Sequence, residues 1–207
     1  KNSLRDLKFK EIGFIIISKS GHTSETLSQF GCIIELASEK NFLSEFFANC
    51  MIITEFKESP LYNIAKKNRC FLLEHNNEIG GRYSVFSNVG MVPAIIADMD
   101  VKEIQKGARE TINNNQIDDF FKLGKTFKFQ NKKKFSTNVI MTYSDFLYNF
   151  GKWYLQLWSE SIGKNKSGIT AIHSIGTTDQ HSQLQLYLDG PKDKFFTFIT
   201  TNHIRKG

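Results

Sequence analysis

Residues 13–18 read Gly-Phe-Ile-Ile-Ile-Ser, a continuous apolar run that ends in a small polar residue. Such a run is typical of a strand that is buried on both faces. The next residues, 19–26, read Lys-Ser-Gly-His-Thr-Ser-Glu-Thr and are rich in residues that form turns and cap helices. From Leu27 to about Lys40, apolar residues recur at helical spacing. This stretch therefore predicts a strand, a polar turn and a helix, the opening unit of an α/β fold.

The same alternation continues along the chain. We expect further strands at 51–55, 70–74, 169–175 and 195–200, and helices at 60–67, 87–97, 101–113, 139–161 and 179–188. A polar, Lys-rich stretch at about 122–137 separates two halves. Strands that alternate with helices at these distances predict parallel sheets covered by helices on both faces.

Composition narrows the class of protein. Of the 207 residues, 40% are hydrophobic, which indicates a globular chain. The net charge of +6 suits a polyanion or a small phosphorylated substrate. Most of the excess is scattered Lys, with one dense run at 132–134, and no aromatic residues interleave with it as a stacking platform requires. Nucleic-acid binding is therefore disfavoured.

The positions of the cysteines and the lengths of the apolar runs indicate the cellular compartment. Cys32, Cys50 and Cys70 lie far apart without a Cys-x-x-Cys pair, which argues against a disulfide framework or zinc site and favours the reducing cytoplasm. The apolar runs are too short to span a bilayer, and the chain opens on no secretory signal. We expect no membrane partner.

Hydroxyl side chains crowd the predicted turn between the first strand and helix: Ser18, Ser20, Thr23, Ser24 and Thr26. A helix N-terminus offers unpaired N–H groups and a positive dipole end, so these hydroxyls suit an anion cradle. Lys19 would add charge, and Gly21 would allow close backbone approach. The alternative is an ordinary Ser/Thr cap without a ligand. The spacing alone leaves both interpretations open, although it lacks the Walker pattern of nucleotide triphosphatases.

Three further residues are candidates for chemistry. Arg82 follows two glycines at 80–81 and carries a donor fork suited to oxyanions, although such a turn often simply presents a surface Arg. Glu160 lies near Trp158, which could desolvate it, but a lone helical Glu usually faces solvent. His181 falls in the first turn of a predicted helix, where a structural role is the commoner one.

Four segments taken together resemble the glucose-6-phosphate isomerase family. Residues 17–27 contain its Ser-Lys-(Ser/Thr)-x-x-Thr-x-Glu-Thr pattern, and residues 80–84 its Gly-Gly-Arg-(Phe/Tyr)-Ser. Residues 160–164 match Glu-Ser-x-Gly-Lys, and residues 176–186 resemble the segment with Gly-Thr-x-x-Gln-His. The segments come in the family's order, and residues 189–193 resemble its bacterial branch.

The resemblance implies a three-layer αβα sugar-isomerase fold with two domains, each incomplete here. Residues 1–98 would belong to the first domain, and residues 99–207 would form linker helices and part of the second. The implied reaction interconverts glucose 6-phosphate and fructose 6-phosphate through an enediolate, in glycolysis and gluconeogenesis. It implies a cytoplasmic homodimer that needs no metal or organic cofactor.

The resemblance also implies roles by position. Glu160 would carry the proton between C2 and C1, and Arg82 would steady the enediolate. His181 would assist ring opening, reaching the site from the partner subunit. The implied substrate-binding residues are Ser18, Lys19, Ser20, Thr23, Thr26, Gly81 and Gln156.

A non-catalytic sugar-phosphate-binding regulatory module of the same fold is the alternative. Such a module needs the cradle but neither Arg82 nor Glu160 nor His181, and all three are present. An enzyme that also accepts mannose phosphate, or one fused to a transaldolase, stays open as well.

We expect the 207-residue chain alone to be inactive or nearly so. By resemblance, a first Gly-Ser phosphate loop would precede Lys1, and a helix with a ring-opening Lys would follow Gly207. A coupled dehydrogenase assay on the purified chain measures this, and turnover close to that of a complete isomerase would contradict it.

Overall fold

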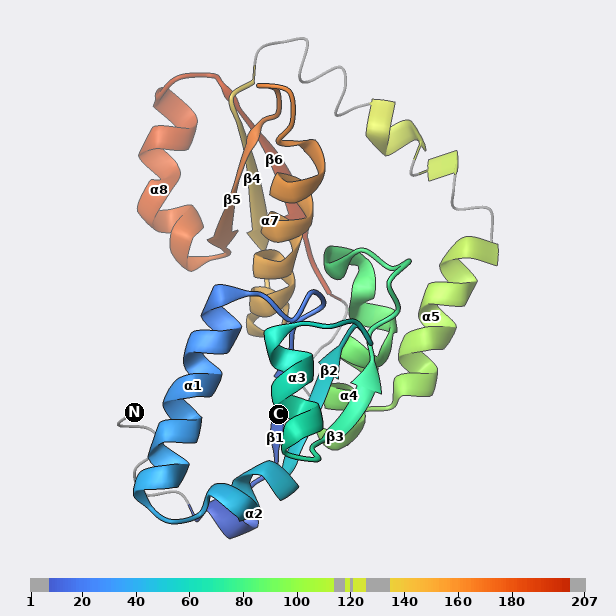
Figure 1. Cartoon of the computed structure of the whole chain (residues 1–207). Coiled ribbons are helices and arrows are strands. Elements are labelled where there is room, and N and C mark those ends of the chain that lie inside the picture. Colours follow the sequence, from blue (N-terminus) through green and yellow to red (C-terminus); the bar gives the residue numbers. More distant parts are fainter. Residues whose placement is uncertain (1–7, 114–117, 120, 126–134, 202–207) are drawn as a thin grey trace. The chain divides into compact units, whose positions relative to one another are not determined.

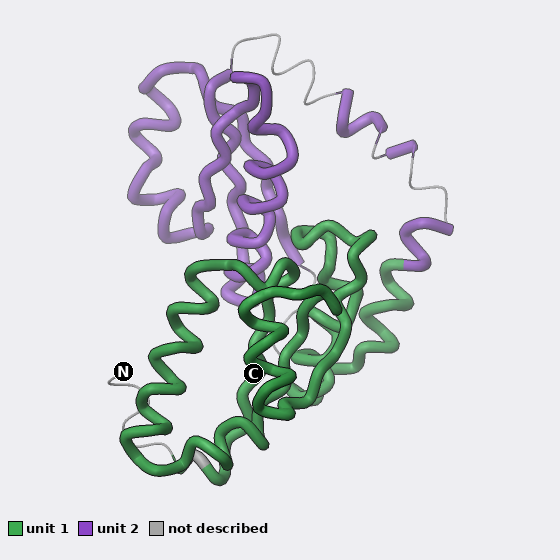
Figure 2. The backbone as a smooth tube through the Cα atoms, in the orientation of Figure 1, with its two compact units in different colours: residues 1–108 green, residues 109–207 purple. Residues whose placement is uncertain are grey.

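The computed structural model describes residues 8–113, 118–119, 121–125 and 135–201, and the chain forms two compact units, residues 1–108 and 109–207 (Figure 2). Within the described residues, each unit contains a three-stranded parallel sheet flanked by helices (Figure 1). The predicted α/β class with parallel sheets is thereby confirmed.

Unit 1, residues 1–108, carries the first half of the alternating pattern. Its described elements are η2 (Phe9–Glu11), β1 (Phe14–Ile17), α1 (Ser24–Glu39), α2 (Leu43–Ala48), β2 (Cys50–Thr54), α3 (Pro60–Lys67), β3 (Phe71–Glu74), η3 (Gly81–Phe86), α4 (Asn88–Ile96) and most of α5 (Val101–Asn113). The strands predicted at 13–18, 51–55 and 70–74 are confirmed, as are the helices at 60–67 and 101–113. Helix α2 was not predicted, because six residues are too few to display helical periodicity.

The sheet of unit 1 has the order β1-β2-β3, with Phe14 opposite Cys50 and Met51 opposite Phe71. The central strand β2 is largely buried, whereas β1 is half-buried along its length. The prediction that residues 13–18 are buried on both faces was thus too strong, because β1 lies at an edge of the described sheet. Since all three strands are parallel, their carboxyl ends lie at the same end of the sheet.

Aromatic rings fill the core of unit 1. Phe30, Phe46, Ile52 and Leu61 are at most 1% exposed, and burying such side chains stabilises the fold by about 1.5–3 kcal/mol each. The Phe46 ring meets Phe14 of β1 edge-on, with centroids 4.8 Å apart. This contact holds α2 against the sheet.

All three cysteines are free thiols. Cys50 and Cys70 are buried, and burial together with the neighbouring Cys70 raises the pKa of the Cys50 thiol to about 12. It is therefore protonated and unreactive at neutral pH. Among the described residues, no group of three His, Cys, Asp or Glu side chains is arranged to hold a metal ion. No helix in this part of the chain is long and apolar enough to cross a bilayer.

Unit 2, residues 109–207, contains β4 (Thr137–Thr142), η4 (Asp145–Leu147), α7 (Tyr148–Ile162), β5 (Thr170–Ile175), α8 (Thr178–Asp189) and β6 (Lys194–Ile199). Its sheet has the order β5-β4-β6, so Thr137 pairs with both Thr170 and Lys194. The Lys run at 132–134 and most of the predicted polar stretch lie outside the described residues.

The prediction of one long helix over 139–161 was wrong in its first part. Residues 137–142 form β4, and the helix begins only at Tyr148. Val139, Ile140 and Met141 are at most 1% exposed because β4 lies between two other strands. A fully buried central strand lacks polar alternation, and so short an apolar run cannot be told from a helix by periodicity.

Gly151 of α7 lies where the helix crosses His173 of β5. A Cβ on Gly151 would overlap the imidazole ring. That ring is held in place, because its Nε2 is 2.8 Å from the Thr142 hydroxyl of β4 and the Tyr148 ring lies 5.6 Å away. The absent side chain thus sets how closely α7 packs on the sheet.

We predict that Gly151→Ala lowers the free energy of unfolding by about 1–3 kcal/mol, because overpacking forces either the His173 ring or α7 to move. Gly31→Ala in α1 is the matched control. Nothing lies within 4 Å of the Cβ it would add, so better helix propensity raises stability by up to about 1 kcal/mol. Denaturant unfolding of both variants measures the two opposite shifts, and equal effects would contradict the packing argument.

Candidate functional site

The turn between β1 and α1 gathers hydroxyl groups as predicted. Ser18 is buried at the end of β1, and its N–H donates to the carbonyl of Ile53 in β2 at 3.1 Å. Its Oγ lies 2.8 Å from Thr23 Oγ1, so the two hydroxyls share a hydrogen bond across the turn. Ser20 is exposed and accepts the His22 N–H at 3.2 Å, which leaves its hydroxyl proton to donate.

The first turn of α1 favours negative charge, and the Glu25 carboxylate lies there. Thr23 is the N-cap residue, but its hydroxyl bonds Ser18 rather than a backbone N–H of the described helix. Glu25 lies in the first turn, where its own backbone N–H and the Ser24 hydroxyl lower the pKa of its carboxyl. The helix end therefore stabilises negative charge, as expected from its dipole and donors. Thr26 is half-buried one residue later.

Gly21 gives the turn its shape. Its φ of +67° lies in the left-handed region, which residues with a Cβ rarely adopt. A Cβ there would also overlap the side chain of Ser59, whose hydroxyl caps α3 by accepting the Tyr62 N–H at 3.3 Å. The Gly21 carbonyl accepts the Leu61 N–H at 3.3 Å. The turn between β1 and α1 thus packs directly against the start of α3.

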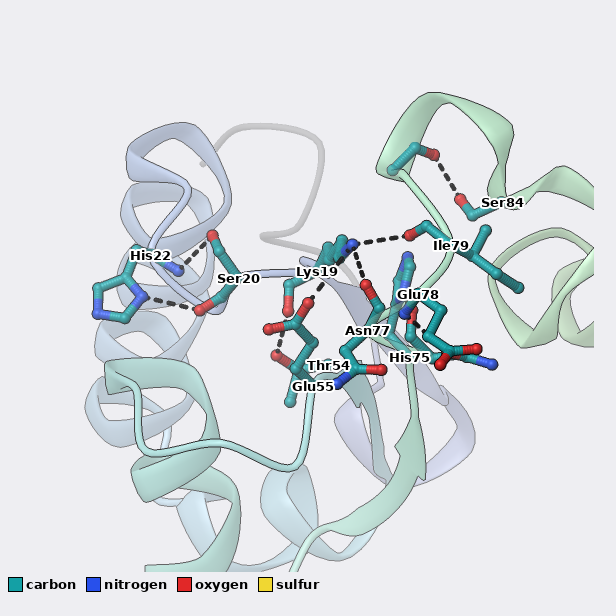
Figure 3. A network of polar contacts seen from close by, with 12 residues as sticks. Lys19, Ser20, His22, Thr54, Glu55, His75, Asn77, Glu78, Ile79 and Ser84 are labelled. Atoms are coloured by element: carbon teal, nitrogen blue, oxygen red, sulfur yellow. Dashed lines mark hydrogen bonds and ion pairs between the residues drawn. The ribbon is translucent and has the colours of Figure 1, made fainter.

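Lys19 faces the protein, as Figure 3 shows, and not the hydroxyls around it in sequence. Its Nζ donates to the carbonyls of Asn77 at 2.9 Å and Ile79 at 2.8 Å, and lies 3.5 Å from Glu55 Oε1. These partners follow the carboxyl ends of β3 and β2. Glu55 was not named by sequence reasoning. Its position at the end of the strand predicted at 51–55 was the signal that could have found it.

Arg82 lies in the first turn of η3, at the end of the loop that leaves β3. Its guanidinium carbon is 4.7 Å from the centre of the Tyr83 ring, a cation–π distance. The Ser84 hydroxyl donates to the Gly81 carbonyl at 2.5 Å, which closes the turn. Because β1 and β3 are parallel, the cradle after β1 and the Gly81–Arg82 turn after β3 lie at the same end of the sheet of unit 1.

In unit 2, Gln156 and Glu160 lie one turn apart on α7. Both are exposed, and Gln156 Nε2 donates to Glu160 Oε1 at 2.9 Å. Trp158 turns to the sheet instead, where its Nε1 donates to the Ile169 carbonyl at 2.7 Å. Glu160 is thus not buried by Trp158, and the suggestion that this ring desolvates the carboxylate does not hold within the described chain.

His181 is exposed in the first turn of α8, which follows the carboxyl end of β5. Glu160 lies near the C-terminal end of α7, where Ser159 and Ile162 line a pocket with Thr170 and Ala171 at the start of β5. The C-terminal end of α7 lies beside the start of β5, whereas α8 begins after its end, so the two residues lie at opposite ends of a strand that spans roughly 17 Å. Unit 2 by itself does not bring them together.

Comparisons with known proteins show the family to which the chain is related. The family model described as phosphoglucose isomerase matches residues 1–205. A glucose-6-phosphate isomerase of Methanocaldococcus jannaschii is 39% identical over 98% of the chain and 50% of its own length. A probable glucose-6-phosphate isomerase of Methanococcus maripaludis is 37% identical over 98% and 46%, and a glucose-6-phosphate isomerase of Campylobacter jejuni 36% over 99% and 51%.

A solved structure shares the fold. It is the crystal structure of a hypothetical protein from Thermus thermophilus, with a TM-score of 0.83 and 29% identity over 95% of this chain and 49% of that one. The chain thus spans about half the length of the relatives and of the solved structure that it matches.

We predict that Gly21→Ala lowers the free energy of unfolding of unit 1 by about 1–3 kcal/mol, because the new Cβ meets Ser59 in a backbone conformation that disfavours it. Gly81→Ala, another glycine of the same sheet edge, is the control. Nothing lies within 4 Å of its added Cβ, so its effect should stay within about 0.5 kcal/mol. Thermal unfolding compares the two. A small effect at Gly21 would show that the turn can take another path.

Proposed function

The chain belongs to the phosphoglucose isomerase family, and on that premise we propose that its full-length protein interconverts glucose 6-phosphate and fructose 6-phosphate. The observation that carries the proposal is the family match over residues 1–205, which includes every predicted site residue. On the same ground of family membership, we propose that the reaction belongs to glycolysis and gluconeogenesis and that the protein is cytoplasmic.

Ser18, Ser20, Thr23 and Thr26 bind the substrate's phosphate at the start of α1. Three features support this: the shared hydrogen bond between Ser18 and Thr23, the outward hydroxyl of Ser20, and the anion-stabilising first turn. The phosphate does not react. Its binding energy instead holds the sugar in position for the chemistry at C1 and C2.

Glu160 transfers a proton between C2 and C1. A proton beside a carbonyl is only weakly acidic, so the enediolate left by its removal needs electrostatic stabilisation. We assign that task to the guanidinium of Arg82, whose donor fork suits an oxyanion, together with the backbone of Gly81. The Gln156 amide orients the Glu160 carboxylate in this scheme and contacts the sugar, which accords with its 2.9 Å hydrogen bond.

His181 assists opening of the sugar ring, and it does so for the partner subunit of a homodimer. The separation of Glu160 and His181 along β5 supports this part of the proposal, because one unit 2 cannot present both groups to one small sugar. The non-catalytic regulatory module remains the competing function. It requires phosphosugar binding without isomerisation.

We predict that Glu160→Gln in the full-length protein lowers kcat by about 10²–10⁴-fold, since the amide keeps the shape of the side chain but cannot accept the proton. Substrate binding should change little. A coupled dehydrogenase assay measures the rate, and NMR measures solvent deuterium incorporation at the sugar's C1 and C2, which should fall in parallel.

Glu39→Gln, an exposed carboxylate at the end of α1, is the control and should leave the rate unchanged. A full-length wild-type protein that binds the sugar phosphate but does not turn it over would replace this proposal with the regulatory module.

A further inference from the structure

The ammonium of Lys19 is held by groups of the protein itself. The ammonium donates hydrogen bonds to two backbone carbonyls, at 2.9 and 2.8 Å, and forms an ion pair with a carboxylate oxygen of Glu55 at 3.5 Å. The side chain of Lys19 is 28% exposed and that of Glu55 is 21% exposed.

Lys19 and its acceptors follow three different strands. Lys19 follows β1, Glu55 follows β2, and Asn77 and Ile79 follow β3. The Lys19 backbone adds to this, because its carbonyl accepts the Glu55 N–H at 3.0 Å and the Thr54 hydroxyl at 3.2 Å. One residue thus ties the cradle turn to both neighbouring loops (Figure 3).

The loop held by Lys19 leads directly to the Gly81–Arg82 turn. Asn76 starts it by accepting the Glu78 N–H on its side-chain oxygen at 2.8 Å and the Ile79 N–H on its carbonyl at 3.2 Å. Next to that turn, the Lys19 ammonium donates to the carbonyls of both Asn77 and Ile79. Two carbonyls so close in sequence, held by a single ammonium, fix the path of the backbone between them.

We propose that Lys19 is a positioning residue, whose ammonium, held by Glu55, sets the distance between the phosphate cradle and the Gly81–Arg82 turn. This rests on the proposed function for its catalytic meaning. A partly exposed ion pair at 3.5 Å adds little stability by itself, so the two shorter bonds to carbonyls hold the loop, and Glu55 orients the ammonium toward them. The expected consequence of losing them is a misplaced Arg82, which affects the transition state more than substrate binding.

Amide hydrogen exchange tests the tie without reference to activity. In full-length Lys19→Met we expect the amides of Ile79 and Tyr83, which bond to Asn76 and Gly80, to exchange at least about ten-fold faster. The Leu27 amide inside α1 should be unchanged. Lys67→Met, which removes an exposed lysine from α3, controls for the loss of charge. Unchanged exchange of Ile79 and Tyr83 would overturn the proposal.

Kinetics separate positioning from direct phosphate binding. Lys19→Met should lower kcat by about 10–100-fold, because a small displacement of a catalytic group suffices for such a loss. The inhibition constant for inorganic phosphate should change less than about two-fold. Lys19→Arg, which keeps donors and charge, should recover part of kcat. A raised inhibition constant with kcat retained would instead make Lys19 a phosphate ligand and overturn the proposal.

Glu55→Gln covers the case in which Lys19→Met does not fold. It keeps the shape of the side chain but loosens the ammonium, so it should shift exchange and kcat in the same direction by a smaller factor, and no shift in either would overturn the proposal. If the wild-type protein has no isomerase activity, the proposed function fails. The exchange measurements would then still decide whether Lys19 holds the loop.

Discussion

Parallel pairing of β1, β2 and β3 is the constraint on which the chemistry of unit 1 depends. Because all carboxyl ends of a parallel sheet lie at one edge, residues that follow different strands become neighbours. Ser18, Glu55 and the loop toward Arg82 each follow a different strand, and Lys19, the residue after Ser18, contacts both Glu55 and that loop with its ammonium group. A slip of one residue in β2 would turn its side chains to the other face of the sheet and break this cluster apart.

The fold was predictable wherever a local signal was unambiguous. Helix α3 begins at Pro60 behind the cap residue Ser59, and its apolar residues keep helical spacing, so its bounds followed from local chemistry. Residues 139–141 had no such signal. Val-Ile-Met fits a buried strand as well as the first turn of the aromatic helix that follows, and only pairing with β5 and β6, far along the chain, decides between them.

In the candidate site, residue types were predictable but side-chain directions were not. The hydroxyls of Ser18 and Thr23 converge because a tight turn leaves them little choice. Lys19 was expected beside the phosphate, yet its long side chain reaches acceptors supplied by a loop nearly sixty residues away in sequence. The placement of Glu160 and His181 at opposite ends of β5 likewise depends on how α7 and α8 run against that strand, which a motif does not encode.

The two sheets also differ in the time at which they can form. In unit 1 the order β1-β2-β3 follows the chain, so the sheet can grow at one edge as synthesis proceeds. In unit 2 the first strand made, β4, occupies the centre and gains its second neighbour only when β6 has emerged from the ribosome. Until then its apolar run at 139–141 has an unpaired edge, which makes it a target for chaperones and for aggregation. Of the two described sheets, that of unit 2 is thus the one whose central strand waits for its second neighbour until the last described strand is made.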